Sequence, residues 1–239
     1  MTTPKSTTAG RAGRAVQHIF SAFAPKTEPR FVILGSGRSG SGYISRVLSA
    51  AGIPCGHESW WNPHGRRQRG LLGDSSWCAL AQVDRSTYSG QVFHQIRHPL
   101  DVISSYVHRH TFTGPFAQLK LPLLAEDPSG DPLRYACRVW LDLNRRSAEL
   151  TTTHWRVEDI DIQLVQQIGA AVGTAPVNVE SAIQSVPTSY NSHDTSRRLG
   201  WQDLPRDLFD EIEAMAQQYG YARDERRPRV SVVNFSRQA

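Results

Sequence analysis

The chain has 239 residues, enough for one large α/β domain or two smaller ones. Its three cysteines are too few and too widely spaced for a disulfide framework or a set of metal ligands. The net charge of +5 resides at the two ends: residues 1–30 hold five basic side chains against one acidic, and residues 223–239 hold five against two. The slightly acidic body between these ends argues against a nucleic-acid-binding protein.

The sequence contains no run of the roughly 20 apolar residues that a membrane-spanning helix needs, and its N-terminus lacks the apolar core of a secretory signal. We therefore expect a cytoplasmic protein with no integral membrane segment. Residues 1–29, rich in Thr, Ala, Gly and Ser, are expected to form a flexible basic tail, and residues 223–239 a basic C-terminal tail. The folded domain is then expected to span residues 30–222.

The first element in chain order is a run of four apolar residues at 31–34, which predicts a strand buried on both faces. The strand leads directly into the glycine-rich segment 35–42. Residues 43–51 then show the apolar spacing of a helix that ends at Gly52. A strand, a glycine-rich turn and a helix start together form an arrangement that holds a phosphate, because the backbone N–H groups and the helix dipole favour an anion.

Strands and helices continue to alternate along the rest of the chain. Further strands are expected at residues 53–56, 91–96 and 154–157. Further helices are expected at residues 99–110, 131–150, 160–172, 179–186 and 205–219. The segment Asp74-Ser75-Ser76 is expected to cap a short helix that begins at Trp77. This alternation predicts a three-layer α/β domain, like that of P-loop nucleotide kinases, with a central parallel sheet of four to five strands flanked by helices.

The glycine-rich segment departs from the P-loop of nucleoside-triphosphate enzymes. Gly35 and Gly40 have the expected spacing, but Ser41 and Gly42 stand where that motif requires Lys and then Ser or Thr. The fixed cation of the segment is Arg38 instead. These replacements disfavour an ordinary kinase or NTPase, although a divergent P-loop kinase remains one alternative interpretation.

The residues Arg38-Ser39-Gly40-Ser41 resemble the 5′-phosphosulfate-binding loop of sulfotransferases, whose pattern is Lys/Arg-Ser/Thr-Gly-Thr/Ser-Thr/Ser. A second match is Arg97, at the end of an expected strand, followed eight residues later by Ser105; this spacing is similar to the family's 3′-phosphate site. A weaker match, at residues 155–160, resembles the family's Tyr-Glu-Asp-Leu strand end. The resemblance covers roughly residues 31–222. It implies the donor 3′-phosphoadenosine 5′-phosphosulfate (PAPS) and the product 3′-phosphoadenosine 5′-phosphate (PAP).

The resemblance also implies which residues bind the donor. They are Gly37, Arg38, Ser39, Gly40, Ser41, Gly42, Tyr43, Arg97, Ser105 and, in a late loop that closes over the adenosine and 3′-phosphate, Arg197 and Arg198. Gly42 departs from the family pattern, because it lacks the hydroxyl that would bond the 5′-phosphate. This departure is consistent with a second alternative, a catalytically inactive nucleotide-binding or interaction protein of the same fold.

The acceptor of the sulfuryl group needs a base, and three residues are candidates. Residues 55–59 are similar to the Cys-Gly-Glu-Glu-Thr stretch of tyrosylprotein sulfotransferases, whose second glutamate is the base; that position is Glu58. His57 is a rival because its ordinary pKa lies near neutrality. Asp74 is a third candidate, because it precedes the expected strand at 91–96, where cytosolic sulfotransferases keep a catalytic Lys-Thr-His. Arg38 would neutralise charge on the leaving oxygen.

The remaining expectations concern the acceptor and the metal. Trp60 and Trp61 are candidates for an apolar platform under an acceptor, which would be a small molecule, a glycan or a peptide. Acceptor choice is expected to depend on the loops 57–75 and 111–130. The histidines at 94, 98, 108 and 110 are spread over different faces of their elements, so no metal is expected. The acceptor's identity and the oligomeric state are not predicted.

Overall fold

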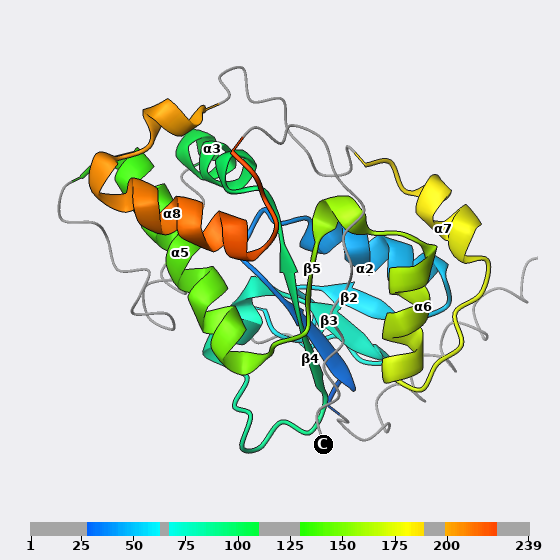
Figure 1. The fold of residues 1–239 in the computed structure, drawn as a ribbon. Helices are drawn as coiled ribbons and strands as arrows, with labels where there is room; N and C mark the ends of the chain where they lie inside the picture. Colours follow the sequence, from blue (N-terminus) through cyan, green and yellow to red (C-terminus); the bar gives the residue numbers. More distant parts are fainter. Residues whose placement is uncertain (1–27, 63–66, 110–129, 189–198, 224–239) are drawn as a thin grey trace, which may run out of the picture.

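The computed structural model describes residues 28–62, 67–109, 130–188 and 199–223. Within these ranges the chain forms a three-layer α/β fold, in which a five-stranded parallel sheet lies between two sets of helices (Figure 1). The two expected tails lie almost entirely outside the described residues, so the domain boundaries stay predictions.

All strands of the sheet are parallel. Their spatial order is β2 (Cys55–His57), β3 (Gly73–Ser75), β1 (Phe31–Leu34), β4 (Gln91–Ile96) and β5 (His154–Arg156). The central strand β1 pairs with β3 on one side and with β4 on the other, and its four side chains are at most 1% exposed. The chain passes from one side of β1 to the other between β3 and β4. Open α/β sheets bind ligands at the carboxyl ends of the strands beside such a change of side.

Four of the five strands were predicted. The strands expected at 31–34 and 91–96 have those bounds, β5 ends one residue early at Arg156, and β2 begins two residues and ends one residue later than expected. The interpretation of Asp74-Ser75-Ser76 as a helix cap is wrong. Residues Gly73–Ser75 form β3, and the 3₁₀ helix η1 (Trp77–Ala81) follows Ser76 without a side-chain cap. The sequence Gly-Asp-Ser does not predict a strand, because it has no apolar pattern.

The helices cover the two faces of the sheet (Figure 1). One face carries η1, α3 (Pro99–Arg109), α5 (Pro132–Leu150) and α8 (Arg206–Gln218). The other carries α2 (Ser41–Ala50), α6 (Ile162–Ala171) and α7 (Val179–Ser185). Two short 3₁₀ helices complete the described elements, η3 (Val157–Asp159) and η4 (Trp201–Asp203). The helices expected from residue 99 onward are confirmed, with ends within two residues of those predicted.

Each face of the sheet has its own apolar core. Trp140, Ile103 and Ile212 belong to the core under α3, α5 and α8, and they are fully buried. Ile44 and Ile168 belong to the core under α2, α6 and α7. Burial of such side chains contributes about 1.5–3 kcal/mol each, so these two cores fix where the loops at the carboxyl edge begin.

The close approach of β3 to β1 requires a glycine at position 73. A Cβ atom there would overlap the ring of Phe31, which is fully buried and cannot move aside. We therefore expect Gly73→Ala to lower the free energy of unfolding by about 1–3 kcal/mol, measured by urea denaturation. The substitution of Phe31 by leucine supplies the control, because in a Phe31→Leu background Gly73→Ala should cost at least about 1 kcal/mol less. Equal costs in both backgrounds would contradict this packing constraint.

Candidate functional site

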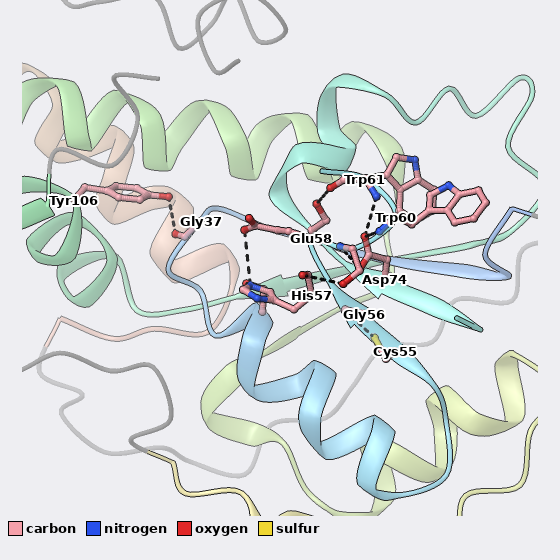
Figure 2. A network of polar contacts seen from close by, with 12 residues as sticks. Gly37, Cys55, Gly56, His57, Glu58, Trp60, Trp61, Asp74 and Tyr106 are labelled. Atoms are coloured by element: carbon pink, nitrogen blue, oxygen red, sulfur yellow. Dashed lines mark hydrogen bonds and ion pairs between the residues drawn. The ribbon is translucent and has the colours of Figure 1, made fainter. Parts of the chain in front are cut away.

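The residues singled out in the sequence follow directly on the carboxyl ends of three strands. The glycine-rich loop 35–40 follows β1, His57 ends β2 with Glu58 next to it, and Arg97 follows β4. Because the carboxyl ends of parallel strands meet at one edge of a sheet, these residues gather there. Figure 2 shows part of this region, with Glu58 and His57 pointing toward one another.

The glycine-rich loop has a backbone that its sequence imposes. Gly40 has φ +87° and precedes α2, and a Cβ atom on it would lie 2.6 Å from Cγ2 of Val157. Arg38 also has a left-handed φ of 67°, which costs a non-glycine residue about 1–2 kcal/mol. Gly40 supplies no side-chain cap to α2, and the first turn of that helix has no acidic residue. The first N–H groups of α2 are therefore suited to an anion.

Helix α3 holds this loop through two consecutive residues. The Nε of Arg38 donates a hydrogen bond of 2.9 Å to Oγ of Ser105. The hydroxyl of Tyr106 donates one of 2.6 Å to the carbonyl of Gly37 (Figure 2). These contacts join the glycine-rich loop to the segment around Ser105, the two parts of the chain that resemble separate sulfotransferase motifs. They also account for the strained backbone at Arg38.

The strand β4 adds a third contact to the loop. Nε2 of Gln95 donates a hydrogen bond of 2.8 Å to the carbonyl of Ser39, while its Oε1 accepts one of 3.1 Å from Nε1 of Trp155. Neither Gln95 nor Tyr106 was among the candidate site residues predicted from the sequence. A signal for Gln95 was present, because it is a polar residue in a strand expected in the central sheet, where a buried amide needs hydrogen-bond partners.

Arg97 joins the same group of residues. Its Nη1 donates a hydrogen bond of 3.3 Å to the carbonyl of Arg38, and its Nη2 lies 3.3 Å from Oδ2 of Asp101 in an ion pair. The guanidinium is therefore in contact with the loop and partly exposed. Arg97 and Ser105, expected as one anion site, both contact Arg38, which was expected at the other.

Glu58 has the properties of a proton acceptor. Its φ is 49°, which makes it one of three described non-glycine residues with a positive φ. Its side chain is 31% exposed, and Oε1 lies 3.7 Å from Nε2 of His57. Burial raises the pKa of Glu58 above its ordinary value, against the opposing effects of a hydrogen bond from Trp77 and the charge of Arg38. A carboxylate with a raised pKa is a stronger base, as proton transfer near neutrality requires.

His57 contacts the glycine-rich loop. Its Nε2 lies 2.9 Å from Oγ of Ser41, at the first residue of α2. Burial lowers the pKa of His57; the charge of Arg38 acts in the same direction, and that of Asp74 acts against both. His57 thus lies between Glu58 and the loop.

Asp74 has a structural role instead of the catalytic one considered for it. The residue is fully buried, and its carboxylate accepts hydrogen bonds from the N–H groups of Ser59, Trp60 and Trp61 at 3.0–3.1 Å (Figure 2). With both oxygens used and no exposed surface, it cannot reach an acceptor. It fixes the turn that immediately follows Glu58.

The expectation of a tryptophan platform is also corrected. Trp60 and Trp61 are 4% and 2% exposed and belong to the core, where Trp61 packs edge-on against Tyr88 with ring centroids 5.5 Å apart. Tyr43 is likewise buried in the other core. Arg197, Arg198 and most of the loop 111–130 lie outside the described residues.

Two further findings concern metals and membranes. Within the described ranges, no three His, Cys, Asp or Glu side chains are grouped so that they could hold a metal ion. Of the histidines considered, His94 is buried and hydrogen-bonded to Asn144, and burial lowers its pKa to about 3. That no metal is required stays a prediction. None of the helices in the described part of the chain is both long and apolar enough to cross a bilayer.

No protein-family model and no curated protein sequence matches this chain. Comparison with solved structures, however, defines the class of its fold, which is that of a sulfotransferase domain. The similar structure is the sulfotransferase domain from the curacin biosynthetic pathway, with a TM-score of 0.51 over 82% of this chain and 99% of that one. At 17% sequence identity, this similarity shows the fold alone.

The three hydrogen bonds to Asp74 generate a stability prediction. Asparagine would turn an amide N–H₂ toward backbone N–H groups, so Asp74→Asn should lower the free energy of unfolding by about 2 kcal/mol in urea denaturation. Asp142→Asn is the matched control, because Asp142 pairs with Arg145 at the surface of α5 and should cost less than about 0.5 kcal/mol. Similar losses in the two variants would contradict the anchoring role of Asp74.

Proposed function

We propose that this protein is a PAPS-dependent sulfotransferase, which moves a sulfuryl group from PAPS to a hydroxyl or amine of an acceptor. The observation that carries the proposal is the contact of Arg38 with both Ser105 and Arg97 beside the start of α2. These three residues are the cations and hydroxyl of the two sulfotransferase motifs. Their contact on a sulfotransferase-like fold supports a donor that carries anionic groups at both ends.

In this proposal the donor lies along the carboxyl edge of the sheet. Its 5′-phosphosulfate accepts hydrogen bonds from Arg38, the Ser41 hydroxyl and the first N–H groups of α2. Its 3′-phosphate binds Arg97 and Ser105, with Arg197 and Arg198 proposed to cover it. The hydroxyl missing at Gly42 removes about 0.5–1.5 kcal/mol of binding, which the remaining donors offset.

The transfer itself is mostly a matter of position and charge. Glu58 accepts the proton of the acceptor, whose oxygen or nitrogen forms a bond to sulfur. The bond between sulfur and the bridging oxygen of PAPS breaks, its electron pair remains on the phosphate of PAP, and Arg38 neutralises that charge. We assign the base to Glu58 because His57 Nε2 is already engaged with the Ser41 hydroxyl. The acceptor is proposed to be a small molecule, a glycan or a peptide.

Ligand binding provides the first test. PAP should raise the melting temperature of the protein more than ATP with Mg²⁺ does, because only PAP has phosphates for both sites. Arg97→Ala should weaken PAP binding about ten- to a hundredfold, since a charged hydrogen bond contributes about 1.5–3 kcal/mol. Arg206→Ala, an exposed change on α8, should leave binding unchanged. A larger shift with ATP and Mg²⁺ would favour a divergent kinase.

Proton transfer provides the second test, in the slow hydrolysis of PAPS to PAP and sulfate, where water replaces the unidentified acceptor. Glu58→Gln should lower kcat at least about a hundredfold with little change in PAP affinity. In the wild type, kcat/KM should fall as the pH drops through the raised pKa of Glu58, because protonation removes the base.

The two candidate bases must be separated by variants, since burial raises the pKa of Glu58 and lowers that of His57, so that the two pKa values shift toward each other. Glu149→Gln, on the exposed surface of α5, is the matched carboxylate control. Binding of PAP without any hydrolysis or transfer in the wild type would favour the inactive nucleotide-binding alternative. Loss of hydrolysis in His57→Gln but not in Glu58→Gln would move the base to His57.

A further inference from the structure

His57 has no role in the reaction once Glu58 is the base, yet it occupies a central place in the site. Its Nε2 lies 2.9 Å from Oγ of Ser41 and 3.7 Å from Oε1 of Glu58. A loop hydroxyl and a candidate base thus meet at one titratable nitrogen. The side chain is 37% exposed, so protons can reach it from solvent.

The direction of the hydrogen bond between His57 and Ser41 decides what the loop can offer to an anion. When Nε2 carries no hydrogen, the Ser41 hydroxyl donates to it and its only hydrogen is used up. The protonated imidazole always carries a hydrogen on Nε2, so it donates to Oγ of Ser41, and the hydroxyl hydrogen is free to point at an anionic oxygen. The first N–H groups of α2 aim at the same place, because Ser41 begins that helix.

The charges around His57 link this choice to ligand binding. Glu58 beside it and Asp74 from β3 favour a protonated imidazole, whereas Arg38 from the loop and partial burial oppose it. An anion bound next to Ser41 from α2 adds a negative charge, which favours the protonated form. Protonation of His57 and binding of the anion therefore stabilise each other.

We propose that His57 is a positioning residue that directs the Ser41 hydroxyl toward the 5′-phosphosulfate of the donor, so that donor binding is accompanied by proton uptake at His57. The inference rests on the proposed function, because it takes the donor and PAP as the ligands of the loop. It assigns His57 a role in donor binding that is distinct from that of a base.

The test is calorimetric titration of PAP between pH 5.5 and pH 8 into the wild type and His57→Gln. Glutamine places an N–H near the position of Nε2 but does not titrate. The ratio of the two Kd values cancels the titration of PAP's own phosphates, whose second pKa is about 6. The ratio of wild-type to variant Kd should fall about three- to tenfold from pH 8 to pH 6. His154→Gln, which changes a histidine at the amino end of β5, should follow the wild type throughout.

The Ser41 hydroxyl must carry this effect. In a Ser41→Ala background the change in the ratio should shrink by at least about half, because His57 then has no hydroxyl to direct and only the attraction between its charge and the anion remains. PAP binding with a ratio that is constant across the pH range would overturn the inference and leave the proposed function standing. An undiminished change without Ser41 would also overturn it, since His57 would then act through charge alone. A wild type that does not bind PAP would remove both proposals.

Discussion

The site depends on the hold that α3 and β4 have on the glycine-rich loop. A left-handed arginine is unfavourable by itself, and it persists because Ser105 and Arg97 each bond to Arg38, one to its side chain and one to its carbonyl. The loop follows β1, whereas both partners follow β4. The contact therefore ties the loop after the central strand β1 to the segment that follows its neighbour β4, and it fixes the guanidinium where, in the proposed reaction, a negative charge would develop.

The charge of the same guanidinium also acts on Glu58 and His57 across the edge of the sheet. Burial raises the pKa of Glu58, and the positive charge of Arg38 opposes this shift. For His57, burial lowers the pKa and the charge of Arg38 lowers it further. One cation thus belongs to the glycine-rich loop and influences the proposed base as well. In the proposed reaction a ligand that neutralises Arg38 would reduce its opposition to the raised pKa of Glu58, so donor binding would make the carboxylate a stronger base.

Most of the fold was accessible from the sequence because it depends on long apolar patterns. The central strand β1 and the helices from α3 to α8 follow from their periodicity, and the loop motif follows from its glycines and Arg38. The strand β3 could not be predicted, because the three residues Gly-Asp-Ser show no apolar periodicity. Their pairing with β1 depends instead on the close approach of Gly73 to Phe31.

The polar contacts within the site were also out of reach. The sequence alone does not show whether an aspartate such as Asp74 serves as a base or as a structural hydrogen-bond acceptor. The three N–H groups that bond to its carboxylate in the structure distinguish the two roles. Trp60 and Trp61 are misread for the same reason, because their loop is polar and aromatic in composition but turns both rings into the core. Motif spacing places residues along the chain, whereas burial and partners decide what they do.

The attachment of the backbone to β3 explains the positive φ at Glu58. The N–H groups of three consecutive residues converge on Asp74, and the N–H of Glu58 itself bonds to the carbonyl of Ser75 at 3.1 Å. The backbone on both sides of the glutamate side chain is therefore attached to β3, and a positive φ at Glu58 is the conformation that joins the two attachments. Since β3 lies between β1 and β2, the buried carboxylate of Asp74 holds the partly exposed one of Glu58 on the same edge as the glycine-rich loop.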